Sequence, residues 1–382
     1  MPEDPFDDLK NGSIVGKRYK VKDLLLQCNV ASFQVMQKLG EGGCGSVFKV
    51  EDIEDKNQQY ALKVEFNSAN AGNVLKMEVQ ILSLMISKKH VAKCVASGKK
   101  PTYSYMVMTL LGESLDSIVR KHGPFLNVSS QVRIGICVLF GIKQIHDIGY
   151  IHRDLKPANV ALGCVSHDGN PNSSIFFQKG SADERYFLVL DFGLARQYVT
   201  DEQDGKKMRR PREKALFRGT ARYCSVAMHD RFEQGRTDDL WTLVYMLAEL
   251  RCQLAWHDVE DKVEIGDMKR AISDADLFAK SPIQMLEFVK IVRGTQFYHR
   301  PDYEKLFKLL DDVMKNADYK WTDPYHWEPD KKRTPSSNKK LSFGLGRKGS
   351  AGGTPTKDSA EGGGQDVAYF TAVDFTSNPI GF

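Results

Sequence analysis

One eight-residue segment, His152–Asn159, constrains this chain more than any other part of its sequence, because it reads HRDLKPAN. Asp154 and Asn159 are five positions apart, the spacing at which a carboxylate and an amide can serve one phosphoryl-transfer site. The carboxylate can accept the proton of a substrate hydroxyl, Lys156 can neutralise the transferring phosphate, and Asn159 can hold a divalent metal ion. A helix-terminal Arg–Asp salt bridge is the simpler interpretation, but it does not explain the whole octad. The segment therefore favours a catalytic site with Asp154 and Lys156 as its catalytic residues.

The triplet Asp191-Phe192-Gly193 supports the same chemistry further along the chain. Alone, this triplet is a common turn signal. Here it follows the strand-like run LVL and lies downstream of Asn159. A carboxylate in that place can bind a Mg²⁺ ion that bridges phosphates, and so we expect Asp191 to be the main metal ligand beside Asn159.

A glycine-rich segment, Gly40–Gly45, follows the pattern G-x-G-x-x-G. The pattern alone is weak, because loop glycines also produce it by chance. The glycines lie between two strand-like runs rather than before a helix, which disfavours a dinucleotide-binding turn. A strand–turn–strand loop can instead fold its backbone amides over nucleotide phosphates. We therefore expect Gly40, Gly42 and Gly45 to lie at a phosphate site.

A lysine and a glutamate follow the glycine-rich segment. Lys63 lies in the apolar strand-like run YALK, and Glu78 comes 15 residues later on the predicted inner face of a helix. An isolated lysine of this kind is more often a surface residue whose stem runs along the sheet. A Lys–Glu pair that holds the α- and β-phosphates of a nucleotide requires this order of strand and helix. The pair is therefore a candidate for nucleotide binding.

These motifs, in this order, resemble those of the eukaryotic protein kinase family over roughly residues 33–310. The resemblance implies that ATP and Mg²⁺ are the cofactors and that the γ-phosphate passes to a protein hydroxyl. Lys156 after HRDL is similar to the serine/threonine kinases. The resemblance also implies where adenine binds. Met108 is at the gatekeeper position, and Thr109, Leu110 and Leu111 form the hinge. The apolar residues that sandwich the ring are Val47, Ala61 and Ala161, and Leu39 is expected to bind the cofactor as well.

Two other functions remain possible on the same fold. A catalytically silent pseudokinase that acts as a binding scaffold would need a defect that the sequence does not show. The residues required for transfer are all present: Lys63, Glu78, Asp154, Asn159 and Asp191. A small-molecule or lipid kinase is disfavoured because HRDLKPAN and the segment GTARY are of the protein-kinase type.

The branch of the family is indicated by the region after the DFG triplet. No A-P-E triplet follows it; the chain instead reads FRGTARYCSV over Phe217–Val226. This segment resembles the casein kinase 1 group, whose members have G-T-x-R-Y-x-S here. The block DFGLARQY, the basic stretch up to FRGTARY, and the segment Gly235–Trp241 look most like the tau-tubulin kinase branch of that group. Arg300–Tyr303 resembles a late motif of the same group.

The hydrophobic periodicity predicts an α+β fold with two lobes. Short β-rich runs with one helix precede Gly112, and mostly helical periodicity follows it. We expect a kinase domain over 33–325, with an N-lobe over 33–112 and a C-lobe over 113–325, preceded by an N-terminal extension over 1–32. A basic Gly/Ser-rich tail over 326–382 is expected to be disordered, because it has too few large apolar groups to offset its ordering entropy. Its last residues, from Val367, are nevertheless apolar and aromatic enough to bind a groove.

The composition is that of a mildly basic globular chain. The formal net charge is +5 over 382 residues, and +3 of it lies in residues 330–382, which hold eight basic and five acidic side chains. This charge does not indicate a nucleic-acid partner. The seven dispersed cysteines, the acidic N-terminus without signal-peptide character and the lack of a long apolar run predict a reduced, intracellular protein with no membrane span. We expect a monomer in the cytoplasm, with nuclear access possible, whose partners are protein substrates.

The region after the DFG triplet is poor in hydroxyl residues and rich in basic ones. Between Gly193 and Arg222 the hydroxyl residues are Tyr198, Thr200 and Thr220. We therefore predict activity without phosphorylation of this activation segment. The basic residues are Lys206, Lys207, Arg209, Arg210, Arg212, Lys214 and Arg218.

These basic residues form either a solvated loop or a docking surface for acidic or already phosphorylated substrates. Arg222 matches an arginine that helps bind an anion in the casein kinase 1 group, and we expect Arg218 and Arg222 to contribute to such a site. The stretch after Trp256 is acidic where relatives are more basic, so that half of this anion site is expected to be missing.

Overall fold

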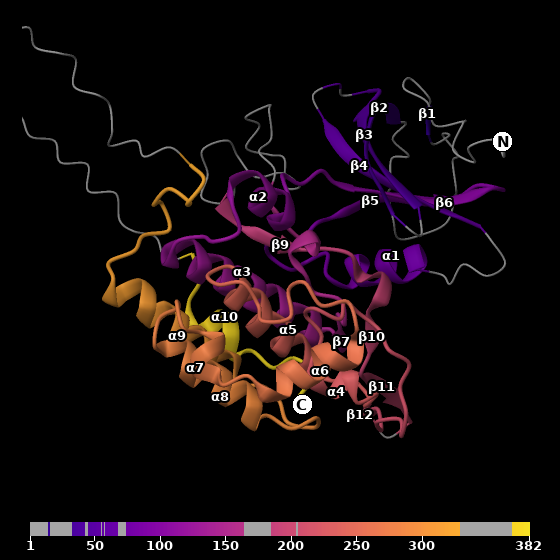
Figure 1. Cartoon of the computed structure of the whole chain (residues 1–382). Helices are drawn as coiled ribbons and strands as arrows, with labels where there is room; N and C mark the ends of the chain where they lie inside the picture. The colour runs from indigo at the N-terminus through magenta and orange to yellow at the C-terminus, as the bar shows by residue number, and fades with distance from the viewer. Residues whose placement is uncertain are drawn as a thin grey trace, which may run out of the picture.

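The structure is a computed structural model that describes residues 14–15, 33–42, 45–54, 56, 58–67, 74–163, 185–203, 205–328 and 369–382. It has two lobes, as predicted, with a β-rich N-lobe above a larger helical C-lobe (Figure 1). The polar, loop-like stretch around 163–185, which the sequence predicts to be a surface insertion, lies mostly outside the described residues, as does most of the predicted tail. The α+β, bilobal fold class is confirmed.

The N-lobe is built on an antiparallel sheet with the strand order β1-β2-β3-β4-β6-β5. Its strands are β1 (Ile14–Val15), β2 (Phe33–Gly42), β3 (Gly45–Asp52), β4 (Gln59–Phe66), β5 (Cys94–Lys99) and β6 (Tyr103–Thr109). Alternate residues of β3 are buried, as a sheet with one covered face requires, so that Phe48 and Val50 enter the lobe's core beside Leu62. One helix, α1 (Val74–Leu84), packs between this sheet and the C-lobe.

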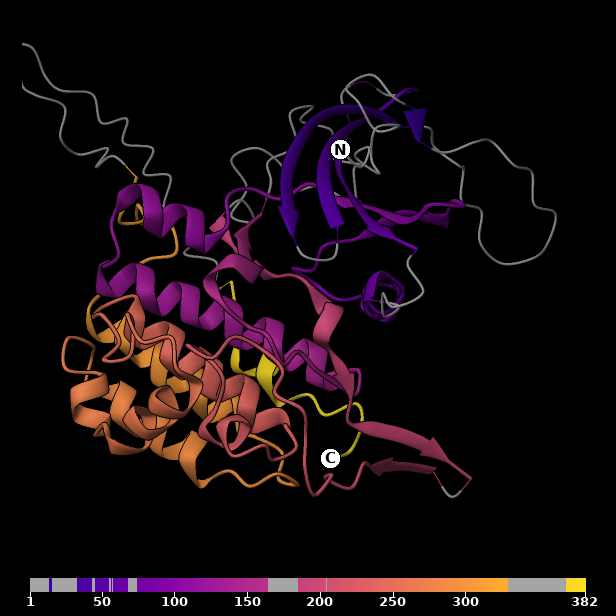
Figure 2. The same cartoon turned by 45° about the vertical axis from the view of Figure 1, so that its right-hand side comes forward.

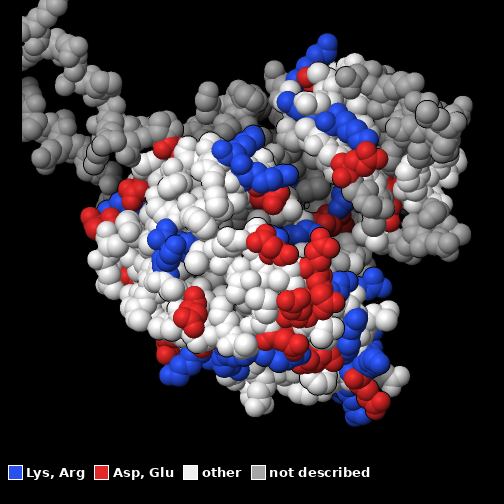
Figure 3. Space-filling view, viewed as in Figure 1, with Lys and Arg blue, Asp and Glu red and all other residues white. Residues whose placement is uncertain are grey.

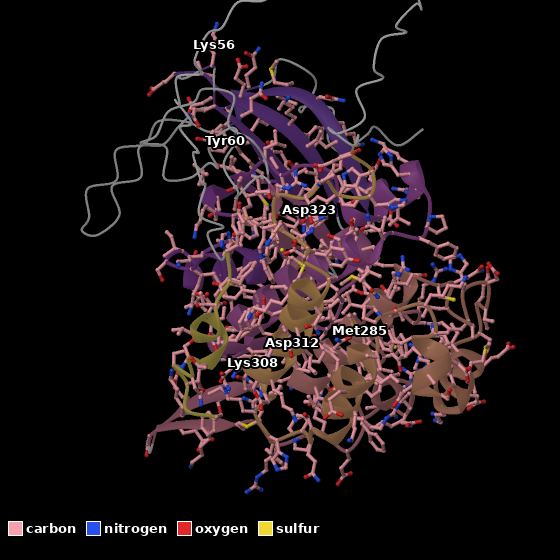
Figure 4. The ribbon with its side chains drawn as sticks, turned by 90° about the vertical axis from the view of Figure 1, so that its left-hand side faces the viewer. Lys56, Tyr60, Met285, Lys308, Asp312 and Asp323 are labelled. Carbon is pink, nitrogen blue, oxygen red and sulfur yellow. The ribbon has the colours of Figure 1, made fainter. Side chains whose placement is uncertain are left out.

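The C-lobe is organised around α3 (Val128–Asp147), which begins at the capping residue Asn127, whose side chain accepts a hydrogen bond from Ser130 N. By length and composition α3 could span a membrane, but 94% of its apolar window is buried inside the protein, as in a core helix. Around it lie α2 (Leu115–His122), α4 (Val226–His229), α5 (Arg236–Glu249), α6 (Lys262–Ala271), α7 (Asp274–Leu277), α8 (Gln284–Gly294) and α9 (Tyr303–Asn316). Figure 4 labels Tyr60 in the N-lobe sheet and Met285 on α8, far below it.

Short paired strands bring the sequence motifs together between the lobes. β7 (Tyr150–Ile151) pairs with β10 (Arg196–Gln197), and β8 (Val160–Leu162) pairs with β9 (Phe187–Val189). The HRDLKPAN segment therefore connects β7 to β8, while the DFG triplet connects β9 to β10. A hairpin of β11 (Val199–Glu202) and β12 (Gly205–Met208) follows and extends away from the C-lobe (Figure 2).

The end of the predicted disordered tail is instead folded onto the C-lobe. Residues 369–382 contain α10 (Ala372–Thr376), and both Phe370 and Phe375 are buried. The expectation of disorder up to Phe382 is therefore wrong for these residues, because aromatic side chains provide the burial that the preceding Gly/Ser-rich stretch lacks. The predicted boundaries also shift slightly: Glu328 is still bound to Arg185, and Ile14–Val15 of the predicted extension pairs with β2.

Candidate active site

A cavity of about 680 Å³ lies between the lobes. The hollow is visible between the upper and lower parts of the molecule in Figure 3. Most of the residues predicted to bind the cofactor line it: Leu39, Gly40, Gly45, Val47, Ala61, Lys63, Glu78, Met108, Thr109, Leu111 and Ala161. The predicted catalytic and metal residues Asp154, Asn159 and Asp191 line the same cavity. The remaining glycine, Gly42, pairs with Gly45 where β2 and β3 meet.

Two glycines at the cavity are required by close packing. A Cβ at Gly45 would collide with the carbonyl oxygen of Val64 on the neighbouring strand, so that only glycine lets β3 approach β4 here. A Cβ at Gly193 would collide with the side chain of Val74 at the start of α1. Gly40, by contrast, has open space around it, and no packing contact in the described structure demands a glycine there. Its lack of a side chain leaves the cavity open.

Lys63 connects three elements at the inner end of the cavity. Its Nζ lies 2.6 Å from Oε2 of Glu78 on α1 and 3.3 Å from Oδ1 of Asp191. Burial alone would lower the pKa of Lys63, but the two carboxylates outweigh it and raise that pKa, so the amine stays charged. Burial raises the pKa of Glu78. Burial would also raise the pKa of Asp191, but the charge of Lys63 outweighs it, so the pKa of Asp191 is lowered.

Asp154 is oriented by hydrogen bonds to both of its carboxylate oxygens. Lys156 Nζ donates to Oδ2 over 2.8 Å, and Thr220 Oγ1 donates to Oδ1 over 2.7 Å. Asn159 Nδ2 donates to the main-chain oxygen of Asp154 over 2.9 Å, which ties the predicted metal ligand to the predicted base. The role of Thr220 was missed, because the sequence shows it only as part of GTARY.

The loop that carries Asp154 is fixed by hydrogen bonds to Asp239, a buried carboxylate on α5. Its Oδ2 accepts hydrogen bonds from the backbone N of His152 at 2.7 Å and from His146 Nε2 at 2.8 Å, and its Oδ1 accepts one from Arg153 N at 2.8 Å. Burial raises the pKa of Asp239, but these donors outweigh it and lower that pKa, so the group remains an anion. Sequence reasoning quoted Asp239 only within the segment Gly235–Trp241 and gave it no role.

The DFG triplet adopts a constrained turn. Asp191 has a positive φ of 62°, in the left-handed region, and its Oδ1 accepts a 3.4 Å hydrogen bond from Gly193 N. Phe192 is buried and packs against His152, whose Nε2 lies 2.9 Å from the carbonyl oxygen of Leu190. The two sequence motifs therefore fix one another, which places Asp191 beside Asn159 at the cavity.

The two arginines predicted to bind a substrate anion, Arg218 and Arg222, differ in whether they are free to do so. Arg218 is exposed. Arg222 is already engaged, because it reaches Glu249 Oε1 at 3.3 Å and donates to the carbonyl oxygen of His257 over 2.8 Å. The carboxylate of Glu249 therefore neutralises an arginine that an incoming anion would need, and the predicted role of Arg222 stays a prediction.

The fold, the cavity and the Lys63–Glu78–Asp191 arrangement are those of protein kinases. A family model described as the protein kinase domain matches residues 33–314. The chain therefore belongs to the protein kinase family, and it is a serine/threonine-protein kinase.

Individual relatives agree with this assignment. A Caenorhabditis elegans protein named as a serine/threonine-protein kinase is 69% identical over 383 residues, covering 100% of both chains. A C. elegans protein named as a casein kinase I is 30% identical over 85% of this chain and 94% of its own length. A third, named an inactive tau-tubulin kinase, is 31% identical over 63% of this chain and 80% of its own length. The predicted likeness to the casein kinase 1 group and its tau-tubulin kinase branch is thus confirmed.

Proposed function

We propose that the cavity between the lobes binds Mg²⁺–ATP and that the chain transfers the γ-phosphoryl group to Ser or Thr hydroxyls of proteins. The observation that carries this proposal is the position of Lys63, with its Nζ 2.6 Å from Glu78 and 3.3 Å from Asp191. A charged amine in this place can hold the α- and β-phosphates, and it needs both α1 and the DFG triplet to be correctly placed.

The cavity suits a nucleotide. Ala61 and Met108 from the N-lobe sheet and Ala161 from the C-lobe give it apolar surfaces, between which a planar base can be sandwiched. Leu110 and Leu111, directly after β6, line the same region. The base would therefore bind near the connection between the lobes, with its phosphates directed toward Lys63.

The donor set suits Mg²⁺. Asp191 and Asn159 offer a carboxylate and an amide oxygen, which are hard ligands of the kind that Mg²⁺ takes. Among the described residues no group of three or more His, Cys, Asp or Glu could hold a metal, so the remaining ligands would be phosphate oxygens and water. Bound Mg²⁺ would neutralise the negative charge of the phosphates. The Asn159–Asp154 hydrogen bond of 2.9 Å holds the amide in a fixed position relative to the base.

Asp154 is the proposed general base. Each carboxylate oxygen has two acceptor positions, so that a substrate hydroxyl can bind beside the hydrogen bonds from Thr220 and Lys156. Asp154 would orient that hydroxyl and take its proton, while Lys156 would offset negative charge on the transferring group.

One relative is named an inactive tau-tubulin kinase, so the proposed transfer is tested against the alternative of a catalytically silent scaffold. A transfer assay with labelled ATP on casein, tubulin and the protein itself separates the two. We expect phosphate incorporation by the wild-type protein and incorporation about 10²–10⁴-fold slower by Asp154→Asn. Nucleotide binding without any incorporation by the wild-type protein would establish the scaffold instead.

We also propose a preference for acidic or phosphorylated substrates, which rests on the surface around β12. Arg209 and Arg210 are exposed and line a cavity of about 560 Å³ together with Arg196 and Thr200. Two neighbouring cations are already neutralised, since Lys207 pairs with Glu202 and Arg212 with Glu233. Basic side chains gather at this hairpin in Figure 3, beside a smaller acidic group.

A matched pair of variants tests this preference. We expect Arg209→Ala/Arg210→Ala to lower kcat/KM about 10-fold for an acidic or phosphorylated peptide but not for a neutral one, because charge-assisted hydrogen bonds are lost. The control Lys290→Ala/Lys305→Ala removes the same charge from α8 and α9. Equal kcat/KM for primed, acidic and neutral peptides in the wild-type protein would contradict the preference.

A further inference from the structure

Residues Tyr369–Phe382, hereafter the strap, lie along the C-lobe and make three separate contacts with the rest of the kinase. The strap runs from beneath α3 toward the β11–β12 hairpin, as its yellow trace shows in Figures 1 and 2. Its anchor is Phe375, which is fully buried and stacks on Phe307 of α9 with ring centres 4.4 Å apart. Figure 4, which labels Lys308 and Asp312 on α9, shows α10 beside that helix.

The first contact reaches the loop that follows α1. Phe370 lies 5.5 Å from the ring of His90 and 5.0 Å from that of Phe140 on α3. The loop is also tied to α3, because Gln144 Nε2 donates to the carbonyl oxygen of Lys89 over 2.8 Å. Since this loop directly follows the helix that carries Glu78, the strap buttresses the element that positions the Lys63–Glu78 pair.

The second contact is polar and lies in the middle of the strap. Lys143, a buried lysine of α3, donates from Nζ to Ser377 Oγ over 2.7 Å while it pairs with Asp147. Arg300 Nη2 donates to the main-chain oxygen of Ser377 over 2.8 Å. These directional bonds fix the position of the chain as it leaves α10.

The third contact reaches the catalytic loop and the activation segment. Ile380 and Phe382 pack in one apolar cluster with Ile151, Tyr198, Val199 and Met208. Ile151 directly precedes His152, Tyr198 connects β10 to β11, and Val199 begins β11. The strap therefore covers the residues at which the catalytic loop and the activation segment lie side by side.

Arg236 strengthens this third contact. It is 2% exposed, and its Nη1 donates to the main-chain oxygen of Phe382 over 2.8 Å while its guanidinium lies 4.9 Å from the ring centre of Tyr198. A buried arginine must satisfy its donors, and here one partner is supplied by the strap. Arg236 opens α5, the helix that carries Asp239, so the strap also contacts the support of the catalytic loop.

We propose that the strap is a built-in activating element of the kinase. It holds the loop after α1, the catalytic loop and the activation segment in their catalytic arrangement, although none of its residues lines the ATP cavity. The proposal rests on the phosphoryl-transfer function proposed above. Loss of the strap's contacts with these segments should therefore lower turnover without changing the binding of ATP.

The test uses the full chain with Ile380→Ala/Phe382→Ala, which removes the apolar contacts but keeps the hydrogen bond to the Phe382 main chain. The control is Val373→Ala, on the outer side of α10, where the residue is 75% exposed. We expect kcat to fall about 10-fold or more in the double variant, because small misplacements of catalytic groups cost up to about 10²-fold. The KM for ATP should stay unchanged, and the control should match the wild type.

Hydrogen exchange supplies a second measurement that locates the effect. Two backbone hydrogen bonds hold the start of the activation segment, from Tyr198 N to Gly149 O and from Arg209 N to Tyr198 O, each at 2.8 Å. We expect these two amides to exchange faster in the double variant, while amides in α8 exchange as in the wild type.

Each outcome has a defined meaning. Faster local exchange with reduced kcat and an unchanged KM for ATP supports the strap as an activating element. An unchanged kcat overturns the proposal, and so does a uniform rise in exchange over both lobes, which would make the strap a stabilising element only. A wild-type protein that transfers no phosphate would overturn the proposed function itself, which is a different result from an active but strap-independent kinase.

Discussion

Thr220 of the activation segment donates a hydrogen bond from Oγ1 to Oδ1 of Asp154, over 2.7 Å, although the two residues are 66 positions apart. The bond connects the segment that would receive the substrate to the proposed base. With Lys156 bound to the other oxygen at 2.8 Å, the carboxylate has one defined orientation. Catalysis should therefore depend on the hydroxyl of Thr220 as well as on Asp154.

We predict that Thr220→Val lowers kcat about 10-fold or more, the effect expected when a hydrogen bond to a charged group is lost. Thr220→Ser keeps the hydroxyl and should retain most of the activity. The KM for ATP should be unaffected in both, because Thr220 does not line the cavity. Steady-state kinetics on one peptide at saturating ATP checks this, and similar losses for Ser and Val would contradict it.

Glu233 explains why the activation segment should not need a phosphate. Its side chain is 5% exposed and binds both Arg212, at 3.0 Å through Oε1 and more closely through Oε2, and Arg196, at 3.4 Å. Burial would raise the pKa of Glu233, but the arginines outweigh it and lower that pKa. A permanent carboxylate therefore joins two arginines of the activation segment.

From this we predict that phosphatase treatment leaves the activity of the wild-type protein unchanged. Glu233→Gln, which removes the charge but keeps the shape, should lower kcat about 10-fold. The matched control is Glu213→Gln, an exposed glutamate of the same segment. A phosphatase-treated sample without activity would show that a phosphate is required after all.

The burial of His90 makes stability depend on pH. Burial and the neighbouring Lys89 lower its pKa to about 4, while Asp374 of the strap acts in the opposite direction. In the unfolded chain His90 titrates near 6.5, so below that pH the unfolded state binds the proton first. The contribution of neutral His90 is therefore complete above about pH 6.5 and is lost as the pH falls toward 4.

We predict that this loss amounts to about 3 kcal/mol between pH 6.5 and 4, from a pKa difference of about 2.5 units. His90→Asn removes the titrating group and tolerates the positive φ of 51° at this position. Urea unfolding of both proteins across this pH range checks the prediction. Parallel pH profiles for wild type and variant would mean that His90 is not the group responsible.

Much of the site could be predicted because its residues act in fixed local patterns. The Lys63–Glu78 pair follows from a strand and then a helix, and the structure joins the two side chains at 2.6 Å. The resemblance to protein kinases, carried by the DFG and HRDLKPAN segments, implied that the two meet at one cavity. Gly45 was predicted only as part of a phosphate site, and its need for close packing of β3 on β4 comes from the structure.

The rest depends on tertiary contacts that no local pattern encodes. Asp239 supports the catalytic loop from a helix 85 residues beyond Asp154, and nothing in the sequence pairs the two. The strap was predicted to be disordered with the rest of the tail, which has few large apolar groups, although its residues were recognised as apolar and aromatic enough to bind a groove. Its position depends on tertiary packing, because Phe375 stacks on Phe307 of α9 and both belong to the core of the C-lobe.

Single-turnover phosphoryl transfer tests the central claim most directly. Wild-type protein and Asp154→Asn would be mixed with a Ser-containing peptide and saturating Mg²⁺–ATP, with nucleotide affinity measured separately for each. The account predicts that Asp154→Asn binds ATP as the wild type does but transfers phosphate about 10²–10⁴-fold more slowly. Equal transfer rates for the two proteins, or no transfer by the wild-type protein despite bound Mg²⁺–ATP, would contradict it.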